Sequence, residues 1–566
     1  MEKSKKPGGS ASSSSKVTRA PRKKAVKTVS DAAPAIPVTE IVQSAQRRYL
    51  IAPRRGKSAL EAGIKPMSAS EMDETLACMP GVTLVKTLKA PAASQLMSAE
   101  RGEATDTYLV SMDEATAAML QETAPPHILI EEDAPLDYGE TRKVELGEMV
   151  PQALCNATPV RQTFVLQVTS QSGTPIPEVP VTVKAEGFPV SGITDDKGQV
   201  QLSVLLQPGS SPRSLSISPT KGFWNRRIHQ PQLQPGRINV VQLFGLDEPS
   251  PLGHPLTRTP WGPQLMGFGQ CRIGSGRGVR VAVIDSGTDN SHPQLAHISH
   301  GYDFTDPSMP HTWHLDLIGH GSHCSGVIGA RAATGAAFEQ VTGLAPDAEI
   351  HSLKIFPGGS VSSLIEALDY CIDHQIDVAN LSLGTEKISL SVEQKLEEAA
   401  SLGVACIVAT GNSGGHVLYP AASPYVLAVS ALGMRSKIPP GARELEEIQP
   451  DLTNDRGLFV PRFSCYGPQV DVCAPGVGVI STVPGMGLRP DSGTSMAAPH
   501  ISGLAAGLLS DAEISPLLGQ RGSERVERLF ELIRAICTPV LEHDPANHSG
   551  AGLPSLSNLN RLLPHR

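Results

Sequence analysis

The sequence contains little cysteine, and what it has is not arranged in pairs. Nine cysteines are scattered along 566 residues with no C-x-x-C spacing, at Cys78, Cys155, Cys271, Cys324, Cys371, Cys406, Cys465, Cys473 and Cys537. The odd number and the scatter argue against a disulfide framework. We therefore expect free thiols in a reducing compartment.

Long apolar runs are also missing. The basic residues near Met1 are not followed by the apolar stretch of a secretory signal peptide. No segment approaches the roughly 18 apolar residues that a transmembrane helix requires. We therefore expect a cytoplasmic protein without a membrane span. Export by a route that the sequence does not display is the alternative.

Acidic residues are almost absent from the start of the chain. Residues 1–30 hold nine lysines and arginines and one acid, a net charge of +8, and the whole chain carries −8. The remainder therefore carries −16. Such a tail can contact nucleic acid or a membrane surface. The low complexity of residues 1–45 instead predicts a disordered, solvated tail, and we do not expect nucleic acid as a partner.

A chain of 566 residues is too long for one core. Residues 46–140 have the pattern of a small α+β domain, with strands and helices in the order βαββαβ. The predicted strands are 49–53, 81–86, 106–110 and 127–131, and the predicted helices are 71–79 and 113–121. This order predicts a ferredoxin-like domain.

Residues 158–247 have a different pattern. Short alternating segments at 164–168, 179–183 and 238–243, with a polar turn inside 192–200, predict a β-sandwich accessory domain. The phrase 192–198 resembles carboxypeptidase-regulatory or immunoglobulin-like modules, which implies a spacer or docking role. A proline-rich linker follows at 248–260.

The largest block, residues 261–563, alternates apolar strands with helical stretches. The predicted strands are 279–284, 349–355, 378–383, 404–409 and 426–430. This alternation predicts an α/β domain with a parallel sheet flanked by helices. No internal repeat is evident.

Four motifs in this block carry side chains with catalytic chemistry. Asp285 ends an apolar strand, where α/β sheets place their ligand sites. His320 stands between two glycines at the start of a predicted helix. Ser495 stands where a loop enters a helix, beside unpaired N–H groups that can stabilise an oxyanion, and Pro499 suits the first turn of that helix.

The fourth motif is Asn412 on a glycine-rich loop, where a side-chain amide can donate to developing negative charge. Each motif alone is more common as a cap, a turn or a structural histidine. Their order of Asp, His, Asn and Ser matches the order of the subtilisin triad, with Asn in between. The flanking phrases Trp261-Gly262, 379–384 (ANLSLG) and 473–476 (CAPG) agree with it.

On these residues, 261–563 resembles the subtilisin-like serine proteases, the subtilases. Residues 46–140 resemble, in pattern and position, the inhibitor-type propeptide that precedes many of them. The resemblance implies a serine endopeptidase in which Asp285, His320 and Ser495 form the catalytic triad and Asn412 serves the oxyanion hole. It implies a peptide or protein substrate and the chain's own propeptide as partners; the oligomeric state stays open.

The resemblance also implies a substrate-binding site. Substrate backbone would pair with Ser382, Leu383 and Gly384, as in β-augmentation. Val361 and Leu364 would line the pocket for the fourth residue before the scissile bond. Leu418 stands where subtilisins often have a small residue at the floor of the primary pocket, so a small side chain is expected there.

Metal and cofactor sites are not predicted. Gln294 stands where the family often has an aspartate that binds calcium, and 331–343 lacks an evident set of oxygen ligands. The spacing of the histidines at 292, 297, 300, 311 and 314 fits no helical zinc pair. We therefore expect no metal and no cofactor, with calcium as an open alternative.

Two questions of function remain open from the sequence. A peptide-tailoring leader protease or a transpeptidase is an alternative to a general endopeptidase, and a pseudoprotease that acts as a binding scaffold is a further one. We expect self-processing within 133–148, ahead of the β-sandwich, rather than in the linker at 248–259.

Overall fold

The structure is a computed structural model of the whole chain, and it describes residues 46–65, 67–99, 105–139, 158–186, 188–246, 260–333, 340–544 and 547–562. The predicted tail 1–45 and all but the last residue of the predicted linker 248–260 lie outside the described residues. Cys155 lies outside them as well. The other eight cysteines are free thiols.

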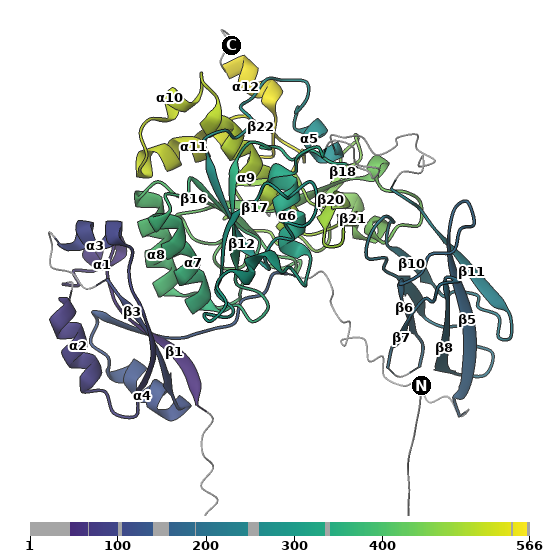
Figure 1. Cartoon of the computed structure of the whole chain (residues 1–566), viewed down its shortest axis with the longest axis horizontal. Helices are drawn as coiled ribbons and strands as arrows, with labels where there is room; N and C mark the ends of the chain where they lie inside the picture. The colour runs from purple at the N-terminus through teal and green to yellow at the C-terminus, as the bar shows by residue number, and fades with distance from the viewer. Residues whose placement is uncertain are drawn as a thin grey trace, which may run out of the picture. The chain divides into compact units, whose positions relative to one another are not determined.

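Residues 46–139 fold around a four-stranded antiparallel sheet of order β2-β3-β1-β4 (Figure 1). The strands are β1 (Arg47–Pro53), β2 (Thr83–Leu88), β3 (Thr107–Met112) and β4 (Ile128–Glu132). The helices are α1 (Lys57–Glu61), α2 (Ala69–Ala77), α3 (Ala92–Ala99) and α4 (Glu114–Thr123). Helix α2 begins at a capping box formed by Ser68 and Glu71. Helices α1 and α3 have no counterpart in the prediction.

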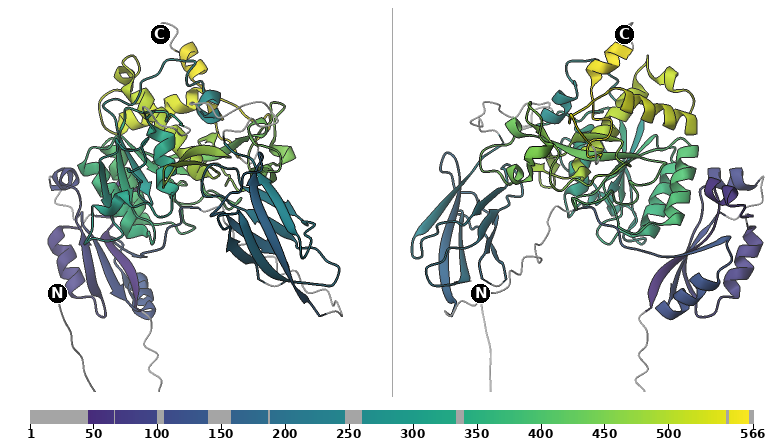
Figure 2. Two further views of the ribbon diagram at one scale, coloured as in Figure 1. Left: turned by 45° about the vertical axis from the view of Figure 1, so that its right-hand side comes forward. Right: turned by 180° about the vertical axis from the view of Figure 1, so that it is seen from behind.

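Residues 158–246 form two facing sheets, of order β10-β9-β6-β7 and β11-β5-β8, which can be followed in Figure 2. The strands are β5 (Val160–Ser170), β6 (Pro180–Lys184), β7 (Val190–Ile193), β8 (Gln199–Leu206), β9 (Ser214–Ile217), β10 (Arg226–His229) and β11 (Ile238–Leu243). Strand β8 alternates buried and less buried residues along its length. That period of two places Val200, Leu202 and Val204 in a core shared with β5 and β6. We call residues 158–246 the β-sandwich below.

Residues 260–562 contain an eight-stranded sheet, parallel over β13-β14-β12-β15-β16-β17, with β19 also parallel to β17 and β18 antiparallel to it. The strands are β12 (Arg280–Asp285), β13 (His300–Asp303), β14 (Glu349–Lys354), β15 (Val378–Leu381), β16 (Ala405–Ala409), β17 (Leu427–Met434), β18 (Leu458–Phe459) and β19 (Val472–Pro475). Two small hairpins pair β20 (Val479–Val483) with β21 (Gly487–Asp491), and β22 (Cys537–Thr538) with β23 (Leu553–Pro554).

Helices cover both faces of this sheet. They are α5 (Trp261–Leu265), α6 (His320–Gly329), α7 (Val361–Asp373), α8 (Leu390–Ser401), α9 (Thr494–Ser510), α10 (Ser515–Leu518), α11 (Ser523–Ala535) and α12 (Leu556–Leu562). In β12, Val281 and Val283 join the core under α6 and α9, whereas Ala282 and Ile284 join the core under α7 and α8. The α/β fold class with helices on both faces of a parallel sheet is confirmed.

The N-terminal sheet packs on the domain of residues 260–562 through α7 and α8. Leu50, Leu88 and Leu109 belong to the same buried apolar cluster as the inner faces of these two helices. Arg55 forms an ion pair with Glu398 on α8 at 3.0 Å, with both side chains nearly buried. Among the described residues, no helix is both long and apolar enough to cross a membrane.

Candidate active site

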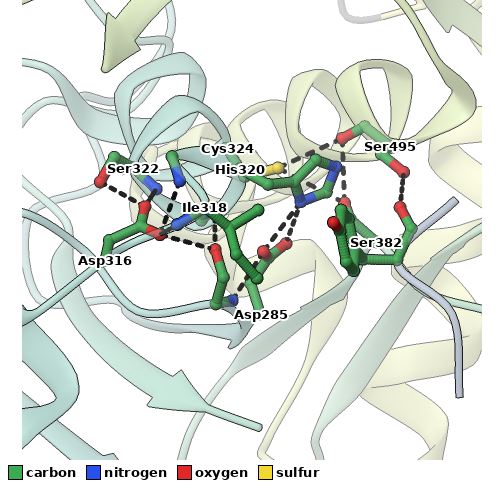
Figure 3. A network of polar contacts seen from close by, with 12 residues as sticks. Asp285, Asp316, Ile318, His320, Ser322, Cys324, Ser382 and Ser495 are labelled. Carbon is green, nitrogen blue, oxygen red and sulfur yellow. Dashed lines mark hydrogen bonds and ion pairs between the residues drawn. The ribbon is translucent and has the colours of Figure 1, made fainter. Parts of the chain in front are cut away.

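Asp285 and His320 are brought together by the sheet and its first covering helix. Asp285 is the last residue of β12, and His320 is the first residue of α6. The imidazole Nδ1 lies 2.8 Å and 2.9 Å from the two carboxylate oxygens of Asp285 (Figure 3). Both side chains are buried, so this ion pair is shielded from water and fixes the orientation of the imidazole.

The backbone of α6 is positioned by Asp316. Its carboxylate accepts hydrogen bonds from the amides of Ile318, Gly319 and Ser322 at 3.1, 2.8 and 2.9 Å (Figure 3). The Ser286 hydroxyl also donates to Asp316 (2.9 Å) and accepts from the amide of Gly321 (2.9 Å). The carboxylate thus satisfies N–H groups at the start of α6, which a helix cannot satisfy itself.

Ser495 is the second residue of α9. Pro499 lies in the second turn of this helix, so the expectation that it occupies the first turn is wrong. Its ring has no N–H to donate to the carbonyl of Ser495, four residues earlier. That carbonyl instead accepts from the hydroxyl of Ser382 at 2.9 Å and the thiol of Cys324 at 3.4 Å (Figure 3). Side chains from two other elements therefore hold the backbone of Ser495.

Asn412 lies on the loop after β16, and its amide has a fixed orientation. The Oδ1 atom accepts from the backbone N–H and the hydroxyl of Thr494 at 2.8 and 2.9 Å. The Nδ2 atom is therefore turned the other way. It donates to the carbonyl oxygen of Gly139 at 2.6 Å.

Residues 133–139, which we call the cleft segment, run past these groups, and Gly139 at the end of the segment has a φ of +67°. Asp137 exchanges two backbone hydrogen bonds with Gly384, of 2.9 and 2.7 Å. Leu136 donates to Gly359 at 2.9 Å, and Val361 donates to Ala134 at 3.0 Å. The cleft segment is therefore an added strand held between two backbone stretches, which is the geometry of β-augmentation.

The cleft segment ends at the candidate catalytic groups. The ring of Tyr138 lies 5.4 Å from that of His320 and 5.3 Å from that of Phe356, measured between centroids. The Ser495 hydroxyl donates to the carbonyl of Tyr138 at 3.2 Å, so in the described structure its hydrogen bond goes to the cleft segment and not to His320.

The predicted pocket residues lie around this segment. Leu136 is buried in the same apolar cluster as Val361 and Leu364. Leu418 packs against Gly384 and Gly411, since a Cβ atom placed on either glycine would lie 3.3 or 2.7 Å from its side chain. Of the residues predicted to pair with substrate backbone, Gly384 makes the backbone hydrogen bonds to Asp137. The Ser382 hydroxyl instead donates to the carbonyl of Ser495.

Burial and charge shift the pKa values of this cluster. Burial lowers the pKa of His320, but the charge of Asp285 and its hydrogen bond outweigh burial, and the net pKa is raised. Burial raises the pKa of the Cys324 thiol well above its usual value. This cysteine is therefore a neutral donor rather than a thiolate nucleophile.

One group of three potential metal ligands occurs among the described residues, and it is Asp285, His320 and Cys324. The Asp285 carboxylate already accepts hydrogen bonds from the His320 imidazole and from the amide of Ser286. A thiol whose pKa is raised resists the deprotonation that metal binding needs. We propose no metal here.

Gln294 is buried, and its amide ties two backbone stretches together. Its Nε2 donates to the carbonyls of Arg331 (3.2 Å) and Val341, and its Oε1 accepts from the amide of Val341 (3.3 Å). The Gln294 amide thus satisfies carbonyl oxygens that a bound cation would otherwise coordinate. The absence of calcium from this site stays a prediction.

We therefore expect chelation to leave thermal stability nearly unchanged. A bound cation would stabilise the folded state by mass action, and its removal would lower Tm by several degrees or more. The measurement is the Tm of the full chain with EDTA and with added calcium. A drop of roughly ten degrees in EDTA that calcium reverses would contradict the assignment of Gln294.

Sequence reasoning missed the contributions of Asp316 and Cys324, whereas Tyr138 and Gly139 lie within 133–148, where self-processing was expected. Asp316 lies three residues before the N-cap Gly319, outside the usual capping positions, so no standard capping pattern marked it. For Tyr138 and Gly139 the sequence indicates only the range 133–148, and the fold decides which residues of that range contact Asn412 and Ser495.

Comparison with known proteins gives four similarities. The profile of the subtilase family matches residues 276–522. Subtilisin Savinase from Lederbergia lenta is 39% identical over 237 residues, which cover 41% of this chain and 76% of that protein. M-protease from Shouchella clausii (strain KSM-K16) is 39% identical over 237 residues, which cover 41% of this chain and 54% of that protein.

The chain thus spans about half the length of M-protease. A solved structure, S41 psychrophilic protease, is 27% identical and covers 52% of this chain and 99% of that chain, with a TM-score of 0.43. The match to Subtilisin Savinase extends over 76% of that protein, and the family profile spans Asp285, His320, Asn412 and Ser495. This chain therefore belongs to the subtilase family.

Proposed function

We propose that this chain is a serine endopeptidase that cuts itself between Gly139 and Glu140 and then acts on other peptides. One observation carries the proposal: the carbonyl oxygen of Gly139 accepts a hydrogen bond from Asn412 Nδ2 at 2.6 Å. The Ser495 hydroxyl donates to the carbonyl of the residue just before it, Tyr138. A carbonyl that already accepts from an oxyanion donor is the one polarised for attack.

The residues at hand supply each step of acyl transfer. Ser495 Oγ turns to His320, loses its proton to the imidazole and forms a bond to the carbonyl carbon. Asp285 holds the imidazole tautomer and stabilises the imidazolium. Asn412 Nδ2 donates to the oxyanion. His320 passes the proton to the leaving nitrogen as the C–N bond breaks, and water then hydrolyses the acyl-enzyme with the same base.

The N-terminal domain is proposed to be an inhibitory propeptide. Its support is the set of acids that it places on the catalytic domain. Asp133 accepts from the amide and hydroxyl of Ser362 at the start of α7, at 2.8 and 3.0 Å. Glu131 accepts from the Ser389 hydroxyl and the amides of Leu390 and Ser391 at the start of α8.

Carboxylates at helix N-termini are stabilising because the N–H groups there have no partners within the helix. The same domain leads directly into the cleft segment. It would therefore remain bound after the first cut and compete with substrate until it is degraded. The β-sandwich, which follows the proposed cut, would stay joined to the catalytic domain.

The test is covalent labelling of purified protein with a fluorophosphonate, with Ser495→Ala as control. We expect the wild type to be labelled once the N-terminal domain has been removed, and the control not to be. A scaffold without activity would not be labelled in either form. Product masses from cleaved peptides distinguish hydrolysis from the transpeptidase alternative, since joined ends have a different mass.

Replacing Asn412 by alanine should lower kcat by about 10²- to 10³-fold, with a smaller change in KM. The amide donates to negative charge that develops only in the transition state, so its loss affects the chemical step. The measurement is steady-state kinetics on a short peptide substrate. A change confined to KM would show that Asn412 binds the substrate without stabilising the oxyanion.

The pH profile should report His320. The imidazole must be neutral to accept the serine proton, so kcat/KM should fall as the pH drops through its pKa, which Asp285 raises above the ordinary 6.5. In Asp285→Asn, the raising charge is absent and the midpoint should move down. A wild-type midpoint below that of the Asp285→Asn variant would contradict the ion pair as the cause.

A further inference from the structure

A cavity of about 400 Å³ opens beside Ser495 and is shared by two domains. The end nearest the candidate catalytic groups is lined by Gly139, His320 and Ser495. The opposite wall belongs to the β-sandwich, from Pro180 and Thr182 on β6 and from Ser218, Pro219 and Thr220 after β9.

The wall formed by the β-sandwich is fixed to the catalytic domain. Trp224 is buried in the main apolar core of the catalytic domain and packs against Gly478. Lys221 donates to the carbonyl of Gly485 at 2.9 Å. Arg227 forms an ion pair with Glu446 at 3.2 Å. The β-sandwich is therefore a structural part of this cavity rather than a tethered neighbour.

The position of the cavity relative to the cleft segment tells which part of a substrate it can receive. The cleft segment pairs with Gly384 and Gly359 and reaches the candidate catalytic groups at Gly139. In a substrate bound at the same place, the residues before the scissile bond would pair with the same backbone at Gly384 and Gly359. The residues after that bond then lie beyond His320 and Ser495, where the cavity is.

Glu444 lines the cavity and has an unpaired hydrogen-bond acceptor. Its side chain is buried, with 4% relative exposure. Its Oε1 accepts from Asn225 Nδ2 of the β-sandwich at 3.2 Å, whereas its Oε2 has no hydrogen-bond partner among the described residues. A buried acceptor left unpaired is costly, so a ligand that brings a donor is favoured.

The other charges around the cavity agree with a donor ligand. Glu447 and Asp491 line it together with Arg443 and Arg489. Arg489 is already paired with Asp491 at 2.8 Å. Burial raises the pKa of Glu444 to about 7 and also raises that of Glu447, because it outweighs the opposing charge of Arg443.

We propose that the β-sandwich and the catalytic domain together form the binding site for the substrate residues that follow the scissile bond, and that Glu444 accepts a hydrogen bond there from a lysine, arginine, asparagine or glutamine side chain. This inference rests on the proposed peptidase activity and adds a selectivity to it. It gives the β-sandwich a role in substrate recognition, beyond that of a spacer.

The first test fills the cavity from the β-sandwich. Two substrates share the sequence Leu-Asp-Tyr-Gly; one ends in a fluorogenic amide, and the other continues for six residues. In Ser218→Trp the ratio of kcat/KM for the long over the short substrate should fall at least about tenfold. The matched control is Gln201→Trp, an exposed position on β8 in the other sheet, which should keep the wild-type ratio.

An unchanged ratio in Ser218→Trp would overturn the inference while leaving the peptidase proposal intact. Failure of the wild type to cut either substrate would instead overturn the peptidase proposal. The two failures are thus distinguishable. Circular dichroism of both tryptophan variants checks that each is folded.

The second test changes the chemistry of Glu444. In a library of peptides with Leu-Asp-Tyr-Gly followed by randomised positions, the wild type should favour donor side chains over aspartate and glutamate at one position. In Glu444→Gln the amide oxygen can keep the bond to Asn225 and turn its NH₂ group to the cavity, so that preference should be lost or reversed. An identical profile in both proteins would mean that water alone satisfies Oε2, and would overturn the role of Glu444.

Discussion

Replacing Ser495 by alanine should abolish both self-cleavage and peptidase activity while the protein stays folded. The serine supplies the only atom that bonds to the substrate carbonyl in the proposed mechanism. Loss of the serine or the histidine of such a triad costs on the order of 10⁶ in kcat, as measured in subtilisin itself. The substitution removes one hydroxyl at the start of α9, whose backbone is held by Ser382 and Cys324.

The measurement compares wild type and Ser495→Ala after equal incubation, by intact mass and by hydrolysis of a peptide substrate. We expect a new N-terminus at Glu140 in the wild type and an intact chain in the variant. Ser413→Ala, on the loop next to Asn412, serves as a matched control. Equal processing in Ser495→Ala would show that another group or another protease makes the cut.

Enlarging the pocket at Leu418 should change the residue accepted before the scissile bond. In the wild type, Leu418 packs against Gly384 and Gly411. We propose that it closes the primary pocket there, so that only glycine or alanine fits. Leu418→Gly would open that space. We expect wild-type kcat/KM to favour Leu-Asp-Tyr-Gly over Leu-Asp-Tyr-Phe substrates by about 10² or more, and Leu418→Gly to reverse the order.

The same pocket governs self-cleavage. Gly139 has φ of +67°, and a Cβ atom added there would lie 2.8 Å from Asn412 Nδ2. Gly139→Phe should therefore stop processing, and adding Leu418→Gly should restore at least part of it once the segment adopts an extended form. His416→Ala, an exposed neighbour of Leu418, is the control. Ready processing of Gly139→Phe in the wild-type background would rule out Leu418 as the floor of the pocket.

Much of the catalytic domain follows from the sequence alone. The apolar strand that ends in Asp285, the glycines around His320 and the serine at a helix start are local patterns, and each marks a point where a strand or helix ends. Their order along the chain identified the family, which the comparisons confirm. The five strands predicted for this domain begin within one residue of β12, β14, β15, β16 and β17, because such apolar runs are a strong local signal.

Short elements were less predictable. Helix α1 has five residues and α3 has eight, too few for an apolar pattern to be distinguished from a loop. Pro499 was expected in the first turn of α9, because proline is common there. In the structure it lies one turn later. Because proline has no N–H, the carbonyl of Ser495 accepts hydrogen bonds from the Ser382 hydroxyl and the Cys324 thiol instead. Sequence statistics could not show this, since the compensating donors come from β15's end and from α6.

The sequence by itself determined the positions of most long strands, the order of the candidate catalytic groups and the family. Only the tertiary structure decided which of the chain's own residues lie at those groups. Gly139 is separated from Asn412 by 273 positions and Tyr138 from Ser495 by 357, so no local pattern connects them. Their meeting depends on the packing of the N-terminal sheet on α7 and α8 and on backbone pairing with Gly384, which any sequence of suitable shape can make.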